Sequence, residues 1–292
     1  MSHSQQTVSP LRQRMIEDMN MRKLTPKTQT TYIRAMKKLA RFLGFPPDQA
    51  TAEDLRRFLV DLSEQGASIG TMNATITGLR FFFQYTVDNP DVVRKLKGRT
   101  LPKKIPVILT PEEVTRLLQA TDNLKYRAAF SVAYGAGLRI NEICHLKVND
   151  IDSKRMMIRV EQGKGRKDRN AMLSENLLSI LRSWWRVGRA KGKLFPNGWL
   201  FPGLNPINPL STRQLARVCA AVAQTAKLDK KVTMHCLRHS YATHLLEQKV
   251  DLRVIQVLLG HSKIETTTRY TQVATSLLKE ANSPLDSLTL PT

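Results

Sequence analysis

Residues 235–271 begin with H-C-L-R-H-S-Y-A-T-H and end with L-G-H-S-K-I-E-T-T-T-R-Y-T. The first run is predicted to be helical, and its His235 and Arg238 are three residues apart, so both side chains face the same way on a helix. His261 and Tyr270 lie in the second run, nine residues apart. One short segment therefore carries the imidazoles of His235 and His261, the guanidinium of Arg238 and the phenol of Tyr270.

Two stretches upstream carry further charged side chains. The run G-A-G-L-R-I-N-E-I-C-H-L contains Arg139 and Glu142, and the run Q-G-K-G-R-K-D-R places Lys164 on a turn flanked by glycines. Transfer of a phosphodiester builds negative charge on the nonbridging oxygens, and guanidiniums meet that charge with bidentate hydrogen bonds. The reaction also needs a nucleophile, and a general acid for the leaving oxygen.

These residue types match the tasks of such a reaction. Arg139 and Arg238 are the candidate guanidiniums, and Tyr270 is the candidate nucleophile. Lys164 is the candidate general acid, with Lys167 in the same turn as its rival. Because these side chains supply their own positive charge, we expect the chemistry to need no metal ion, nucleotide or other cofactor.

A zinc site is the alternative explanation for part of this segment. His235 and His239 stand at positions i and i+4, the spacing of a helical zinc pair. The sequence places no third ligand nearby and contains no H-E-x-x-H pattern. We therefore interpret His239 and His244 as hydrogen-bonded histidines of the core or of a helix face.

The charge of the chain indicates its partner. The 292 residues have a formal net charge of +22. Residues 1–109 hold 18 basic residues against 9 acidic ones, and residues 110–292 hold 28 against 15, so both parts share the excess. A compact protein with so much unbalanced charge repels itself, and nucleic acid is the usual partner that relieves this repulsion. Ribosome association and simple solubility are the alternatives.

Helix signals dominate both parts of the chain. Caps, prolines and apolar spacing predict helices near residues 11–19, 25–43, 51–62, 68–85, 111–120, 124–136, 141–147 and 174–185, near 211 and again after 233. Residues 156–160 and 170–173 are typical of a hairpin or small sheet. The proline-containing basic stretch 98–109 predicts an extended linker between a helical domain, 1–97, and a mixed domain, 110–292.

Cysteine usage and hydropathy bear on the compartment. The three cysteines, Cys144, Cys219 and Cys236, form no C-x-x-C pair and are interpreted as reduced thiols. No apolar run approaches ~18 residues, and the first residues have no signal-peptide pattern. We therefore expect a soluble, cytoplasmic protein with no membrane partner.

The order R…K…H-x-x-R…H…Y, together with the L-G-H-S box, resembles the tyrosine recombinase (phage integrase) family. The resemblance covers nearly the whole chain. It implies an active site made of Arg139, Lys164, His235, Arg238, His261 and Tyr270, with Glu142 in support. The chain departs from the family pattern at Met172, where proline is common, and at Gln272, where histidine is common.

The resemblance also implies an architecture and a reaction. Residues 1–97 would be a SAM-like core-binding domain and 110–292 the catalytic domain with a C-terminal tail. The fold would be mainly α with a small antiparallel β-sheet, forming a two-domain C-shaped clamp on double-stranded DNA. The enzyme would be a monomer or weak dimer when free and a tetramer in the synapse. It would exchange strands through a 3′-phosphotyrosyl bond and a Holliday junction.

Two other functions remain open from the sequence. A type IB topoisomerase uses the same side-chain chemistry without synapsis, but the separate N-terminal helical domain and the residues after Tyr270 favour a recombinase. A DNA-binding protein without activity is the second, and the complete set of polar residues argues against it. Transposon recombinase, phage-type integrase and Xer-like resolvase are all compatible with the pattern.

Overall fold

The computed structural model describes residues 9–100, 105–161, 168–261 and 263–271. The chain divides into two compact units, residues 1–103 and residues 104–292, and the division falls inside the predicted linker. The predicted fold class is confirmed, because the chain is mainly helical and its sheet is small and antiparallel. The sheet belongs to the C-terminal unit, as expected.

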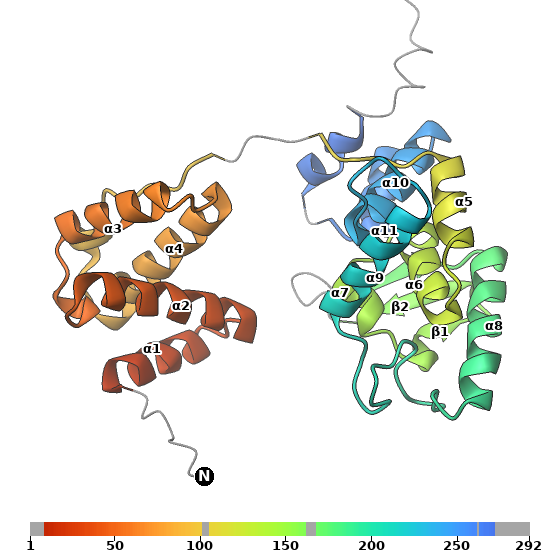
Figure 1. The fold of residues 1–292 in the computed structure, drawn as a ribbon, viewed down its shortest axis with the longest axis horizontal. Helices are drawn as coiled ribbons and strands as arrows, with labels where there is room; N and C mark the ends of the chain where they lie inside the picture. Colours follow the sequence, from red (N-terminus) through yellow and green to blue (C-terminus); the bar gives the residue numbers. More distant parts are fainter. Residues whose placement is uncertain (1–8, 101–104, 162–167, 262, 272–292) are drawn as a thin grey trace, which may run out of the picture. The chain divides into compact units, whose positions relative to one another are not determined.

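The described part of the first unit is built from helices (Figure 1). Its elements are α1 (Pro10–Met21), α2 (Pro26–Leu43), η1 (Pro47–Gln49), α3 (Ala52–Glu64), α4 (Ile69–Phe81), η2 (Phe82–Thr86) and η3 (Pro90–Val93). Each α-helix begins after a residue whose side-chain oxygen accepts a backbone N–H of the first turn. These N-caps are Ser9, Thr25, Thr51 and Ser68.

The helix predicted to reach residue 85 changes geometry after α4. Its continuation, η2, is a π-helical turn, which is wider than an α-helical turn. Phe82 and Phe83 are both buried there, with their rings edge-to-face at 5.1 Å, while Tyr85 is exposed. The hydroxyl of Thr86 donates to the buried carboxylate of Asp18 at 2.7 Å, and this bond ties η2 to α1.

The second unit mixes helices with a three-stranded antiparallel sheet of order β1-β2-β3 (Figure 1). Its longer elements are α5 (Pro111–Gln119), α6 (Leu124–Gly135), α7 (Ile140–Cys144), β1 (Ile151–Asp152), β2 (Met157–Val160), β3 (Arg169–Met172), α8 (Glu175–Ala190), α9 (Thr212–Thr225), α10 (Met234–Glu247) and α11 (Leu252–Leu259). Its 3-10 turns are η4 (Val148–Asp150), η5 (Ile264–Thr266) and η6 (Thr268–Tyr270). Two of the three strands were predicted. The third, β1, has only two residues, which is too short to show the alternation of apolar and polar residues that marks a strand.

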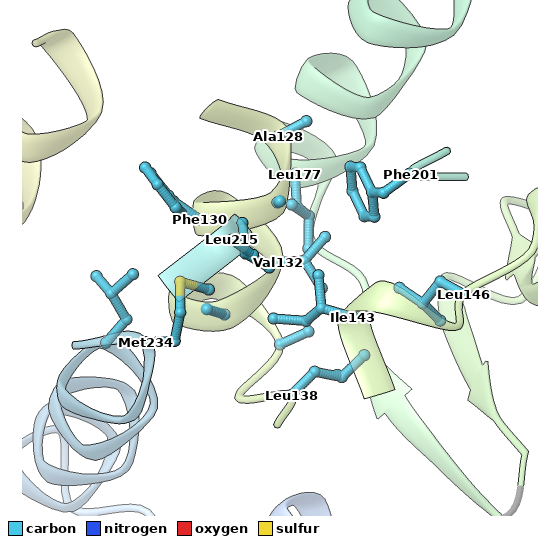
Figure 2. Close-up of a cluster of buried hydrophobic side chains, with 14 of the residues drawn as sticks. Ala128, Phe130, Val132, Leu138, Ile143, Leu146, Leu177, Phe201, Leu215 and Met234 are labelled. Atoms are coloured by element: carbon cyan, nitrogen blue, oxygen red, sulfur yellow. The ribbon is translucent and has the colours of Figure 1, made fainter. Parts of the chain in front are cut away.

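Helix α6 lies at the centre of the second unit. Residues 128–133 are buried without interruption, the pattern of a helix covered on every side. It packs against α8, α10, α7 and α9. Figure 2 shows Phe130 and Val132 of α6 together with Leu177 of α8, Leu215 of α9 and Met234 of α10.

The end of the predicted linker belongs to the second unit. Leu109 is fully buried in that unit's core, and its backbone N–H donates to the hydroxyl of Ser240 on α10 at 2.8 Å. The capping box of Thr110 and Glu113 follows at once and starts α5. The sequence placed this residue in the predicted linker because a three-residue apolar run, Val107-Ile108-Leu109, between two prolines has no helical period.

All three cysteines are free and buried, in agreement with their interpretation as thiols. Burial raises the pKa of the Cys144 and Cys219 thiols to about 12, so both are inert at neutral pH. In the described ranges of the chain, no helix is long and apolar enough to cross a membrane.

Replacing Ser240 with alanine tests how firmly the chain is fixed where it enters the second unit. Ser240→Ala leaves the buried N–H of Leu109 without its acceptor, which should lower the free energy of unfolding by about 1–3 kcal/mol. Urea denaturation measures this loss. Ser179→Ala, on the exposed face of α8, is the control and should change stability by less than ~0.5 kcal/mol. Equal stability of the two variants would show that the contact does not fix Leu109.

Candidate active site

The candidate residues lie on helix α10, on the short turn η6, or next to the ends of helices α7 and α11. Arg139 stands immediately before α7, after the left-handed Gly137 (φ 65°). Helix α10 presents His235, Arg238 and His239 from its first turns. Helix α11 ends at the left-handed Gly260 (φ 61°), which turns the chain into His261, and η6 carries Tyr270.

These side chains surround one cavity of about 280 Å³. Its lining consists of Pro106, Arg139, His235, Arg238, His239, Gly260, His261, Thr266, Arg269 and Tyr270. Five of the six predicted catalytic residues are among them. The sixth, Lys164, lies outside the described residues, as does its rival Lys167.

Glu142 lies behind the cavity and binds the arginines, an arrangement we call the Glu142 cluster (Glu142, Arg139, Arg169 and Arg238). Its carboxylate accepts from Arg139 Nη1 at 2.8 Å and from both terminal nitrogens of Arg169 at 3.0 and 2.8 Å. Arg238 Nη1 is 3.9 Å from the same group. Burial raises the pKa of Glu142, but the bonds and charge of Arg169, with those from Arg139, outweigh it and lower the pKa overall.

Backbone carbonyls complete the binding of Arg139 and Arg238, two of the three arginines that line the cavity. Arg238 donates to the carbonyls of Gly137 and Leu259, the latter at 2.7 Å, and Arg139 donates to the carbonyl of Gly260 at 3.2 Å. Arg238 is almost completely buried. Burial, with repulsion from Arg139, lowers the pKa of Arg238 to about 10, so it remains a cation at neutral pH.

His261 is fixed from both ring nitrogens. Arg238 Nη2 lies 3.0 Å from its Nε2, and Thr267 Oγ1 lies 2.9 Å from its Nδ1. A guanidinium can only donate, so Nε2 accepts and the proton of the neutral ring is on Nδ1. The ring is stacked on that of Tyr270, with centroids 6.4 Å apart and planes at 14°.

Tyr270 is buried, at 2% exposure, with its hydroxyl inside the unit. The hydroxyl lies 3.1 Å from Nδ1 of His239. Burial raises the pKa of Tyr270 above its ordinary value, although Arg238, Arg269 and Arg139 act in the opposite direction. The side chain is therefore a neutral phenol at neutral pH.

His235 occupies the accessible side of the cavity. Its ring lies against that of His239, with centroids 6.0 Å apart and planes at 26°. Partial burial, with repulsion from Arg238 and Arg139, lowers the pKa of His235. It is therefore mainly neutral at pH 7.

Sequence reasoning missed three residues of this region. Arg169 and Arg269 were not singled out: Arg169 lies in a basic run, and Arg269 is a single arginine among threonines, so neither has a signal of its own. His239 was interpreted as a hydrogen-bonded histidine, which it is, but its partner is the candidate nucleophile. In the described part of the chain, no group of three or more His, Cys, Asp or Glu side chains is placed to hold a metal ion.

Comparison with known proteins gives the family. Residues 108–276 match the sequence model of the phage integrase family, and residues 11–91 match the phage integrase N-terminal SAM-like domain. The chain belongs to the phage integrase family. The resemblance predicted from its motifs is confirmed, and the protein is a tyrosine recombinase that acts in site-specific DNA recombination.

Several relatives cover most of this recombinase. It is 42% identical to y4qK of Sinorhizobium fredii, which is named as a candidate integrase/recombinase. The match extends over 288 residues and covers 97% of this chain and 91% of y4qK. It is 35% identical over 238 residues to tyrosine recombinase XerA of Pyrococcus horikoshii, and this match covers 82% of this chain and 80% of XerA.

Solved structures have the same fold. The crystal structure of XerA recombinase matches with a TM-score of 0.55 at 28% identity and covers 92% of this chain and 96% of that one. The XerH site-specific recombinase bound to a palindromic difH substrate matches with a TM-score of 0.69 at 23% identity and covers 98% and 92%.

Replacing Glu142 with glutamine tests the Glu142 cluster of the recombinase. Glu142→Gln leaves buried guanidiniums without their counter-charge and should lower the free energy of unfolding by on the order of 3–5 kcal/mol at neutral pH. Because the folded-state pKa lies below the ordinary 4.5, the wild-type advantage is complete above that value. It should disappear as the pH falls through the folded-state pKa.

Urea denaturation of wild type and variant at neutral and acidic pH measures both effects. Glu161→Gln is the matched control, because Glu161 forms an exposed ion pair with Arg159. That change should cost about 0–1 kcal/mol. A loss in Glu142→Gln no larger than in the control would show that the cluster does not stabilise the unit.

Proposed function

We propose that this recombinase cleaves a DNA strand with Tyr270 and forms a 3′-phosphotyrosyl bond, which a 5′-hydroxyl of the partner strand then attacks. The observation that carries the proposal is the shared cavity, which Tyr270 lines together with Arg139 and Arg238. A single phosphodiester fits the charge of this cavity. Two successive exchanges pass through a Holliday junction.

Arg139 and Arg238 stabilise the transition state. Their guanidiniums are held by Glu142 and by backbone carbonyls before any substrate is bound, so little reorganisation is needed when charge develops on the nonbridging oxygens. His235 and His261 line the same cavity and contribute further polar contacts. The guanidinium of Arg238 is buried, which strengthens its interaction with the anion.

Lys164 protonates the leaving 5′-oxygen in this mechanism. The assignment rests on its glycine-flanked turn and on the family resemblance. Lys164 itself lies outside the described residues, between β2 and β3 in the sequence, and β3 carries Arg169 of the Glu142 cluster.

Both units bind the DNA, since each carries excess positive charge. Residues 1–97 act as the core-binding domain and residues 110–292 as the catalytic domain of a clamp on the duplex. Recombination takes place in a tetrameric synapse in the cytoplasm. Leu277, Leu278, Leu285 and Leu288, which lie outside the described residues, link neighbouring subunits.

Tyr270→Phe tests the nucleophile. This variant should bind duplex DNA with unchanged affinity and form no covalent adduct on a nicked suicide substrate, because it has no hydroxyl to attack phosphorus. The wild type should form the adduct in excess EDTA and without ATP. An adduct of normal yield in Tyr270→Phe would contradict the assignment, and a requirement for Mg²⁺ would indicate a metal-dependent mechanism instead.

Sulfur at the bridging 5′-position tests the role of Lys164. Lys164→Ala should slow cleavage of the ordinary substrate by about 10²–10⁴. A thiolate leaves without protonation, so most of that defect should vanish on the 5′-thio substrate, whereas the defect of Arg139→Ala should persist. Rescue of Lys167→Ala in place of Lys164→Ala would assign the acid to the other lysine.

A further inference from the structure

The roles assigned so far leave the proton of the nucleophile without an acceptor. Tyr270 is a neutral phenol with a raised pKa, so it has to lose its proton as its oxygen attacks. His239 is a basic group beside it, with Nδ1 at 3.1 Å from the hydroxyl. The two rings are tilted at 53°, with centroids 5.7 Å apart.

The hydrogen bond runs from the tyrosine to the histidine. If Nδ1 donated, the hydroxyl proton of this buried side chain would have no acceptor among the described residues. Buried hydroxyl groups nearly always use their proton in a hydrogen bond. Donation from Oη to Nδ1 therefore satisfies both groups and places the second proton of the neutral imidazole on Nε2.

The other two histidines are less suited to take this proton. His261 directs Nε2 to Arg238 and Nδ1 to Thr267. His235 contacts the ring of His239, and the structure gives it no bond to Tyr270 within the described residues. Of the three histidines that line the cavity, His239 is the one whose Nδ1 lies within hydrogen-bonding distance of the Tyr270 hydroxyl in the described part of the chain.

We propose that His239 is a further catalytic residue, which accepts the phenolic proton of Tyr270 during cleavage and returns it during rejoining. The inference rests on the proposed role of Tyr270 as nucleophile. As the Oη–P bond forms and the P–O5′ bond breaks, the proton moves from Oη to Nδ1, and the leaving oxygen takes a proton from the general acid. Rejoining reverses each transfer.

The charges around His239 make this transfer depend on the substrate. The groups that face it are His235 and Arg238 on α10 and Arg269 and Tyr270 on η6. Burial, followed by the positive charges of His235, Arg269 and Arg238, lowers the pKa of His239 to about 4. A phosphodiester anion in the cavity offsets these charges, so His239 becomes a stronger base only when DNA is bound.

His239→Asn tests the proposal. The asparagine oxygen stands near the position of Nδ1 and accepts a hydrogen bond from Tyr270, but it takes no proton at neutral pH. Adduct formation on the suicide substrate should slow by about 10²–10⁴, with DNA affinity unchanged. His244→Asn is the matched control, because His244 lies on the same helix and bonds to the hydroxyl of Tyr134 at 2.9 Å, away from the cavity.

A ring-fluorinated tyrosine at position 270 separates proton transfer from a structural role. Fluorination lowers the pKa of the phenol, so attack depends less on a base, and the difference in rate between wild type and His239→Asn should shrink. A defect of unchanged size with the fluorinated tyrosine would mean that His239 only positions the ring and would overturn the proposal. So would cleavage by His239→Asn at the rate of the control.

The same assay distinguishes failure of this inference from failure of the proposed function. A wild-type protein that forms no adduct, or a Tyr270→Phe variant that still forms one, contradicts the nucleophile itself. A wild-type adduct that depends on Tyr270 but not on His239 contradicts only the proton transfer.

Discussion

The active site depends on one buried carboxylate. Glu142 is within 4.0 Å of guanidinium nitrogens from three arginines, and without its charge these cations would repel one another in a region of low dielectric constant. The three arginines come from the start of α7, from β3 and from α10. The carboxylate therefore holds residues from three separate elements together at the candidate active site.

Two glycines allow the backbone to join this arrangement. Gly137 and Gly260 both have left-handed backbone angles. The carbonyl of Gly137 accepts a hydrogen bond from Arg238, and the carbonyl of Gly260 accepts one from Arg139. A Cβ at Gly137 would lie 2.5 Å from the Tyr241 ring, and one at Gly260 would lie 2.6 Å from Cδ of Arg169. Both positions thus need glycine for conformation and for space.

Most of the fold and much of the site could be predicted from the sequence, for local reasons. Caps, prolines and apolar spacing marked the helices, and spacing on one helix placed His235 with Arg238. Features that depend on contacts distant in sequence could not be read in this way. Arg169 meets Glu142 across 27 positions, and His239 meets Tyr270 across 31, so neither pairing leaves a periodic signal. The short strand β1 and the burial of Leu109 likewise arise only from tertiary packing.

The lining of the cavity has a consequence for how such an enzyme changes its target over evolution. Its ten residues include three arginines and three histidines and no carboxylate, which suits a phosphate that is the same at every step of DNA. No part of this chemistry needs to recognise a base. Substitutions on surfaces remote from the cavity can therefore redirect the enzyme to a new site while the cleavage machinery stays unchanged, so that target choice and bond breaking diversify independently.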